Sequence, residues 1–131
     1  RRSACFAELP RGSFEGVQHL RPETVAEMMR NQIGDLSAGV LRTVMPGSSN
    51  DHDPYPGMPI RWGLGFMITT EPTPAGRSAG SLAWAGLANT YFWIDRTKKV
   101  CGVFLSQLLP FYDHTAIDLF GKFETEVYKA I

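Results

Sequence analysis

Apolar and β-branched residues in the second half of the chain fall into short runs separated by polar turns. Residues 90–94 and 100–105 are two such runs, and the charged segment 95–99 between them has a length that β-hairpins use. A third run, residues 81–85, ends at Gly86 in a turn of small residues that lets the chain double back. The pattern predicts a small antiparallel sheet built from these three runs.

The segment 62–69, Trp-Gly-Leu-Gly-Phe-Met-Ile-Thr, predicts a further strand. Its two glycines stand at alternate positions, which would leave one face of the strand bare for close packing. Residues 71–80 are rich in proline and glycine and predict a connector. Arg77 and Ser78 are candidates for substrate contact within this connector, but we expect an ordinary surface loop.

Apolar positions three or four residues apart predict an amphipathic helix over residues 21–33. Pro22 suits its first helical position, Glu23 lies in its first turn, and Gly34 ends it. Its apolar stripe consists of Val25, Met28, Met29 and Ile33. A methionine-rich stripe is able to bind a partner, but this spacing favours a face buried in the core.

The same spacing predicts a second helix over residues 115–131 that closes the domain. Its apolar positions are Ile117, Phe120, Phe123, Val127 and Ile131. Asp113 is the expected N-cap. The sequence indicates no nucleophile that His114, the next residue, would activate, so we interpret His114 as a neighbour of the cap and not as a catalytic residue.

Residues 34–61 predict a long loop, because Gly, Pro, Ser, Asn and Asp dominate them. The triplet Asp51-His52-Asp53 suggests metal ligands, yet adjacent residues in an extended loop point in different directions and no other group has matching spacing. We therefore expect a solvated turn there, with no metal and no cofactor. Residues 1–20 show no sustained pattern and stay poorly defined.

The composition is that of one globular domain, with 131 residues of which 44% are hydrophobic and 20% charged. Thirteen basic and thirteen acidic residues cancel, which argues against nucleic acid or an anionic membrane as a partner. No apolar run approaches the roughly 18 residues of a membrane span, and none follows Arg1 and Arg2 as a secretion signal would require. Cys5 and Cys101 match no metal-ligand spacing, and we expect both thiols to be unpaired.

The triplet Trp84-Ala85-Gly86 and its surroundings resemble the C-terminal part of the serine β-lactamase-like hydrolases. These include the penicillin-binding proteins, the class C β-lactamases and the family VIII carboxylesterases, in which a short strand carries Lys-Thr-Gly or His/Trp-x-Gly. The present triplet is most similar to the Trp-Gly-Gly form of the esterases. The resemblance runs from Leu20 to the end of the chain and is strongest over residues 62–68 and 80–110.

The resemblance implies that residues 1–131 form the C-terminal portion of one β-lactamase-like domain. The implied fold is α+β, a partial β-lactamase/transpeptidase-like fold. Three or four antiparallel strands would be covered on one face by the C-terminal helix, with the helix over residues 22–33 at the margin. Relatives complete the sheet with N-terminal strands, so an unpaired edge would favour self-association of this chain.

The resemblance also implies a catalytic Ser-x-x-Lys motif and a Tyr-x-Asn motif, whose Lys or Tyr helps to remove the serine proton. Neither motif occurs in this chain. We therefore expect the chain alone to be inactive, with the nucleophile supplied by an N-terminal portion of the same domain.

In relatives the triplet strand borders the substrate cleft, and the residue after its glycine supplies one backbone N–H of the oxyanion hole. The resemblance thus assigns this N–H to Leu87 and substrate contacts to Trp84, Ala85 and Gly86. An edge-strand N–H held by sheet pairing suits the role, because it is already oriented before the oxyanion forms. Taken without the resemblance, Trp84 is simply a buried aromatic residue and Gly86 a turn residue.

Trp84 and Ala85 stand where lactam-recognising relatives have the Lys and Thr that bind a penicillin carboxylate. Neither donates a charge-assisted hydrogen bond, so a small neutral ester or amide is the favoured substrate. Two functions stay open at this point. The chain is either a C-terminal half-site of an esterase-type serine hydrolase or a non-catalytic binding or interaction module that keeps the cleft wall.

Overall fold

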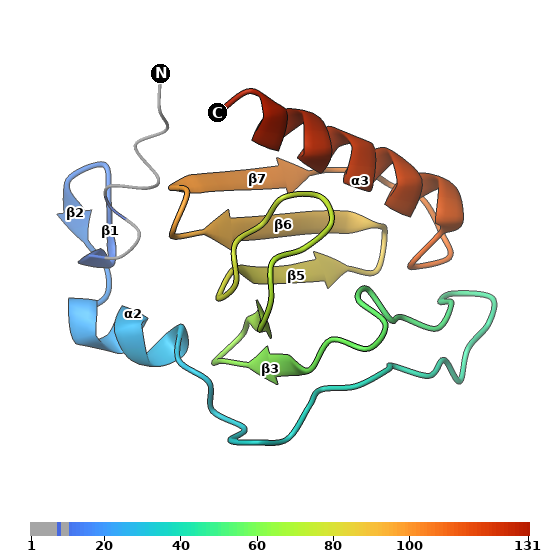
Figure 1. Ribbon diagram of the computed structural model, residues 1–131, viewed down its shortest axis with the longest axis horizontal. Helices are drawn as coiled ribbons and strands as arrows, with labels where there is room; N and C mark the ends of the chain where they lie inside the picture. Colours follow the sequence, from blue (N-terminus) through green and yellow to red (C-terminus); the bar gives the residue numbers. More distant parts are fainter. Residues whose placement is uncertain (1–7, 9–10) are drawn as a thin grey trace.

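Short β-branched and aromatic segments build a five-stranded antiparallel sheet in the order β3-β4-β5-β6-β7 (Figure 1). The computed structural model describes residue 8 and residues 11–131. The strands are β3 Ile60–Trp62, β4 Met67–Thr69, β5 Leu82–Gly86, β6 Thr90–Asp95 and β7 Val100–Phe104. The three C-terminal strands are those that the sequence predicts, and the α+β fold with an antiparallel sheet is confirmed.

Helices α2 (Pro22–Met28) and α3 (His114–Lys129) pack on opposite faces of the sheet, because side chains alternate between faces along each strand. Tyr91 and Trp93 of β6 belong to one core together with Phe120 of α3. Ile94 of β6 belongs to a second core with Val25 of α2.

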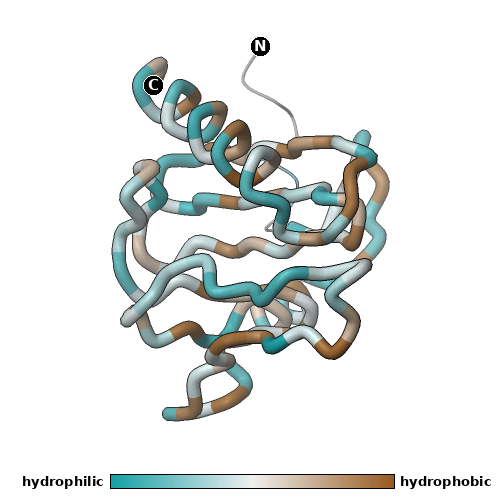
Figure 2. The backbone as a smooth tube through the Cα atoms, turned by 90° about the vertical axis from the view of Figure 1, so that its right-hand side faces the viewer, coloured by the Kyte–Doolittle hydropathy of each residue, from teal (hydrophilic) through white to brown (hydrophobic). Residues whose placement is uncertain are grey.

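Helix α3 runs diagonally beside β7 in Figure 1 and confirms the predicted closing helix. Figure 2 shows hydrophobic and hydrophilic residues alternating around its turns, the pattern of a helix that buries one face. Asp113 caps it as predicted, since its carboxylate accepts hydrogen bonds from the N–H groups of Thr115 (2.9 Å) and Ala116 (3.0 Å).

Trp93 of β6 has no exposed surface. It lies opposite Gly102 of β7. A Cβ atom at Gly102 would lie 2.0 Å from the indole ring, so only glycine leaves room for this tryptophan. The indole N–H donates to the Tyr128 hydroxyl at 3.1 Å, which fixes the side chain against α3.

The segment 62–69 is a hairpin and not the single strand that its pattern predicts. Residues 63–66 turn between β3 and β4, with the Gly63 N–H bonded to the Phe66 carbonyl at 2.8 Å. Gly65 has φ +90°, a backbone conformation that favours glycine. The alternate glycines therefore serve a turn, and β3 begins inside the region predicted to be loop.

The first helix ends at Met28, earlier than predicted. The side chain of Asn31 accepts a hydrogen bond from the Ile33 N–H at 3.1 Å, which offers the backbone an alternative to the helix. Val25 and Met29 are buried as expected, whereas Ile33 lies beyond the helix. Before α2, the poorly defined region contains a short hairpin of β1 Ser13–Phe14 and β2 Val17–Gln18.

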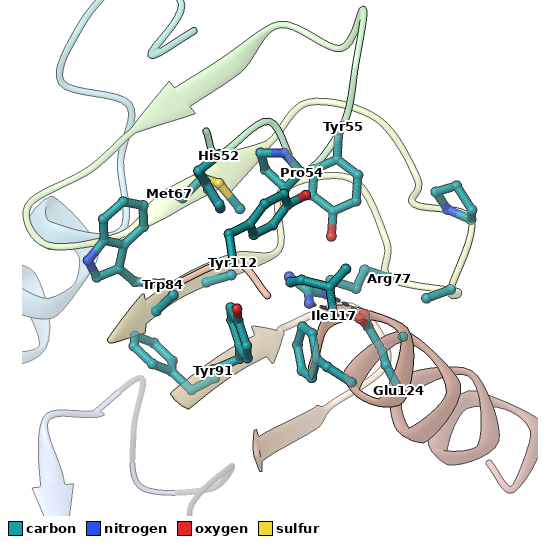
Figure 3. A pocket seen from close by; sticks show the side chains of 17 residues that line it. His52, Pro54, Tyr55, Met67, Arg77, Trp84, Tyr91, Tyr112, Ile117 and Glu124 are labelled. Carbon is teal, nitrogen blue, oxygen red and sulfur yellow. Dashed lines mark hydrogen bonds and ion pairs between the residues drawn. The ribbon is translucent and has the colours of Figure 1, made fainter. Parts of the chain in front are cut away.

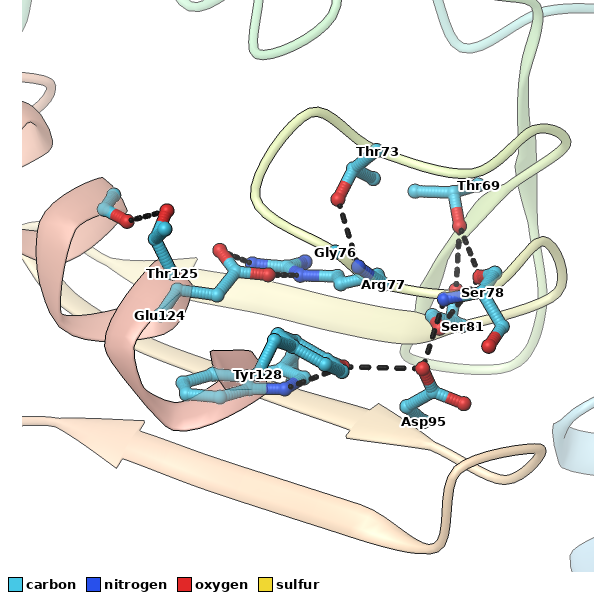
Figure 4. A network of polar contacts seen from close by, with 12 residues as sticks. Thr69, Thr73, Gly76, Arg77, Ser78, Ser81, Asp95, Glu124, Thr125 and Tyr128 are labelled. Atoms are coloured by element: carbon cyan, nitrogen blue, oxygen red, sulfur yellow. Dashed lines mark hydrogen bonds and ion pairs between the residues drawn. The ribbon is translucent and has the colours of Figure 1, made fainter. Parts of the chain in front are cut away.

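Arg77 is buried and not part of a surface loop. It retains 2% of its exposure and donates from Nε and Nη2 to the two carboxylate oxygens of Glu124 on α3. Figure 4 shows this pair beside a second tie, in which Asp95 accepts from the Ser78 N–H (2.8 Å) and the Tyr128 hydroxyl (3.1 Å). The connector 71–80 is thereby fastened to both α3 and β6.

Cys5 lies outside the described residues, and Cys101 is half-buried in β7. Within residue 8 and residues 11–131, no helix is long and apolar enough to cross a membrane. The same part of the chain holds no cluster of three or more His, Cys, Asp or Glu side chains placed to bind a metal ion.

Candidate functional site

The open edge of β5 carries the predicted triplet. β4 pairs with β5 only at Ala83 and Leu82. Trp84, Ala85 and Gly86 extend past this pairing and are joined to β6 alone. β5 is therefore an interior strand in its first half and an edge strand in its second half, where the predicted substrate contacts lie.

A tight turn follows the triplet. The Asn89 N–H donates to the Gly86 carbonyl at 3.0 Å, and Asn89 itself is left-handed with φ 58°. This is the pattern of a type I turn followed by a left-handed residue, a common three-residue hairpin connection. Leu87 comes after the last β5–β6 pair, Gly86 with Thr90, and its side chain is 60% exposed.

A cavity of about 250 Å³ runs beside this edge, between the sheet, α3 and the loop that precedes β3. Figure 3 shows Trp84 at one end and the Arg77–Glu124 pair at the other. Between them the walls are mainly apolar and aromatic and include Tyr55, Tyr91 and Ile117. Since Glu124 neutralises Arg77, the far end does not offer an uncompensated cation to a ligand.

His52 forms part of this wall, although the sequence predicts a solvated turn around it. Its side chain is buried, with its ring centroid 4.7 Å from that of Tyr112 and 6.0 Å from that of Trp84. Burial lowers the pKa of His52, and the charge of Asp53 only partly opposes this effect. The prediction holds for Asp51, which is exposed and pairs with Arg42.

A second apolar cavity, of about 330 Å³, lies on the other side of Trp84. Residues of the long loop, including Ala38 and Leu41, form one wall, and Ile60 and Trp62 of β3 form another. The indole rings of Trp62 and Trp84 meet edge to face, with centroids 4.6 Å apart. The two cavities share four lining residues, so they adjoin each other at the open edge of β5: His52, Pro54, Met67 and Trp84.

Tyr55 and Tyr112 also belong to the first cavity, and neither was a candidate from the sequence. The Tyr112 hydroxyl donates to the Asp53 carbonyl at 3.0 Å, which ties the start of α3 to the loop around His52. Burial raises the pKa of Tyr55 to about 12, so this phenol stays protonated at neutral pH. Tyr55 and Tyr112 reach the cavity through contacts between parts of the chain that are distant in sequence, and the local sequence pattern does not indicate such contacts.

The serines nearest to the site have structural partners. The Ser81 hydroxyl is buried and donates to the Ser78 carbonyl at 2.7 Å. The Ser106 hydroxyl donates to the Ala88 carbonyl at 2.8 Å, on the turn after the triplet. Neither serine lies near a lysine in a Ser-x-x-Lys motif, because the chain contains no such motif. The described part of the site is thus a wall without a recognisable nucleophile.

Comparisons with known proteins point to one family. The sequence model of the family described as Beta-lactamase matches residues 16–122. The acyltransferase calJ of Penicillium decumbens is 33% identical over 95 residues, which cover 70% of this chain and 23% of the relative. The lovastatin esterase of Penicillium rubens is 26% identical over 117 residues, which cover 84% of this chain and 29% of the relative.

Solved structures agree with the sequence matches. A mutant of simvastatin synthase (LovD) from Aspergillus terreus superposes with a TM-score of 0.71 and 25% identity, over 95% of this chain and 32% of that chain. A β-lactamase from Mycobacterium bovis, at 21% identity and a TM-score of 0.64, shares the fold. The present chain spans 23% and 29% of the length of these two curated relatives.

Proposed function

Because this chain belongs to the beta-lactamase family, we propose that it forms the C-terminal wall of a serine hydrolase or acyltransferase active site. The observation that carries the proposal is the edge of β5 that stays unpaired beyond Ala83. Trp84 and Ala85 of that edge line the first cavity, Trp84 also lines the second, and the exposed Leu87 begins the turn that follows the edge. The nucleophile and its base belong, in this proposal, to an N-terminal portion of the same domain.

The Leu87 N–H acts as one donor of the oxyanion hole. Leu87 begins the turn after the last β5–β6 pair, so its N–H is outside the ladder and is oriented by the strand before it. A donor fixed in this way stabilises the developing oxyanion without reorganising, and removal of one such donor costs about 10²–10³ in kcat.

A neutral acyl ester is the substrate class that the two cavities favour. Trp84 lines adjoining spaces of about 250 and 330 Å³, so an ester bound at the open edge has one apolar space for each of its halves. Arg77 is bound to Glu124 and leaves no charge to attract a carboxylate. The names of the relatives, an acyltransferase and a lovastatin esterase, agree with acyl transfer to or from an alcohol.

The experiment compares Leu87→Pro with Leu87→Ala in the protein encoded by the complete reading frame. Leu87 is the second residue of a type I turn, a position that proline favours, so the proline variant removes the N–H while keeping the turn. We expect Leu87→Pro to lower kcat for p-nitrophenyl butyrate about 100-fold or more, and Leu87→Ala to keep it. Equal turnover of the two variants would refute the role of Leu87.

A non-catalytic binding module is the second candidate, favoured by the absence of a Ser-x-x-Lys motif from this chain. The sequence upstream in the reading frame separates the two candidates. A Ser-x-x-Lys motif there, together with labelling of its serine by a fluorophosphonate, supports the hydrolase. An upstream region without the motif and an unlabelled protein support the binding module.

A further inference from the structure

The turn that carries Leu87 is anchored by one fully buried side chain. Asn89 has no exposed surface and adopts φ 58°. A left-handed asparagine is common in turns, but most such residues lie at the surface, where water satisfies the amide. Here the amide is enclosed, so every one of its polar atoms needs a partner within the protein.

Those partners are all present. The side-chain amino group of Asn89 donates to the carbonyls of Leu108 and Pro110, each at 2.8 Å. Its carbonyl oxygen accepts from the Tyr91 hydroxyl at 2.6 Å and from the Asp113 N–H at 3.1 Å. An amide has two donors and two acceptor lone pairs, so its capacity is fully used. The reverse orientation would place donors against the Asp113 N–H, and the orientation is therefore unique.

A second set of bonds holds the same turn from outside. The Ser106 hydroxyl donates to the Ala88 carbonyl at 2.8 Å and lies 2.9 Å from that of Asn89. The Leu108 N–H also donates to the Ala88 carbonyl, at 3.3 Å. The segment from Ser106 to Asp113 is thus hydrogen-bonded to the residues that directly follow Leu87, while the Leu87 side chain is exposed to solvent.

We propose that Asn89 is the positioning residue of the oxyanion turn: its amide clamps residues 86–90 to the segment 106–113 and thereby fixes the direction of the Leu87 N–H. This inference rests on the role of Leu87 proposed above. The Leu87 N–H belongs to the same peptide unit as the Gly86 carbonyl, which accepts a hydrogen bond from the Asn89 N–H at 3.0 Å, so a displacement of Asn89 turns that unit. Loss of the clamp should therefore misdirect the donor, and misplacing a reacting group by about 1 Å costs up to roughly 100-fold in rate.

The test uses Asn89→Gly in the protein encoded by the complete reading frame. Glycine keeps the left-handed conformation and removes only the amide. We expect kcat for p-nitrophenyl butyrate to fall roughly 10- to 100-fold with KM nearly unchanged, and the affinity for phenylboronic acid, which mimics the tetrahedral intermediate, to fall in parallel. Phe123→Ala, which destabilises α3 where it packs on Trp93 and Phe104, is the stability control and should keep kcat below its melting temperature.

The double variant Leu87→Pro/Asn89→Gly separates positioning from folding. If Asn89 acts through the Leu87 N–H, the double variant loses no more kcat than Leu87→Pro alone. Additive losses, or an unchanged kcat in Asn89→Gly while Leu87→Pro is impaired, would overturn the role of Asn89 and leave that of Leu87 standing. An unimpaired Leu87→Pro would overturn the role of Leu87 itself. If Asn89→Gly does not fold, Ser106→Ala takes its place in the same double-mutant cycle. We then expect Ser106→Ala to lower kcat several-fold, and additive losses in the double variant would again overturn the proposal.

Discussion

Replacing Glu124 with glutamine should destabilise the chain strongly, because it leaves Arg77 charged inside the protein. The side chains of Arg77 and Glu124 are 2% and 3% exposed and join through two parallel hydrogen bonds. Breaking a buried ion pair by removing one partner costs about 3–5 kcal/mol, most of it the penalty for the remaining unpaired charge. Glutamine keeps one acceptor oxygen, so we expect about 3 kcal/mol, the lower end of this range.

The matched control removes both charges. The guanidinium of Arg77 lies 5.5 Å from the ring centroid of Trp93 and 5.7 Å from that of Phe120, so methionine at position 77 keeps an apolar neighbour for both rings. Replacing a buried pair by apolar residues of similar volume is often neutral or stabilising. The free energy of unfolding of Arg77→Met/Glu124→Leu should therefore lie within about 1 kcal/mol of that of the parent chain.

Urea unfolding of the 131-residue chain, followed by tryptophan fluorescence, measures both values, since Trp93 is buried next to the pair. The midpoint should fall in Glu124→Gln at constant m-value and stay near its original position in the double variant. A loss below about 1 kcal/mol in Glu124→Gln is the size expected of an exposed pair. That result would refute the inference that the pair is desolvated and fastens the connector 71–80 to α3.

Three further predictions concern the 131-residue chain. Because burial holds the pKa of His52 below its ordinary value of 6.5, the unfolded chain binds more protons than the folded chain as the pH falls. The free energy of unfolding should therefore decrease as the pH drops below about 6.5. Urea midpoints measured from about pH 7.5 to 5.5 check this, and His52→Gln should make them less dependent on pH. The chain should hydrolyse neither p-nitrophenyl butyrate nor a chromogenic β-lactam, and stoichiometric labelling of any serine by a phosphonate would contradict this. The outer edge of β7 should drive self-association, seen by sedimentation at several concentrations as a dimer or larger species instead of a monomer.

Local patterns were sufficient for the elements whose structure depends on neighbours in sequence. Strands β6 and β7 and helix α3 follow from their own periodicity, and the N-cap at Asp113 follows from residue type alone. The hairpin at residues 62–69 was missed because a glycine within a strand pattern can indicate either close packing or a turn. Gly63 does allow close packing, with the Met28 carbonyl 2.3 Å from where its Cβ would lie, but Gly65 serves a turn.

The side chains missed at the site depend on partners far along the chain. Arg77 meets Glu124 across 47 residues, and Tyr112 meets Asp53 across 59. Neither the hydrophobic periodicity nor the composition of the sequence indicates such contacts. The sequence therefore predicts surface loops at the buried arginine and the buried histidine. The resemblance located Trp84 and Leu87 by their motif, but it did not reveal that Asn89 holds their turn.

The length of β4 sets the width of the opening at which Trp84 and Leu87 lie. β4 is the three-residue strand Met67–Thr69, and its pairing with β5 ends at Met67, which lies opposite Ala83. Each residue added to this pairing would cover about 3.4 Å more of β5, and covering Trp84 and Ala85 would close the edge. Lengthening or shortening the turn at residues 63–66 is therefore a route to change how much of β5 stays open, with residues 84–87 themselves unchanged.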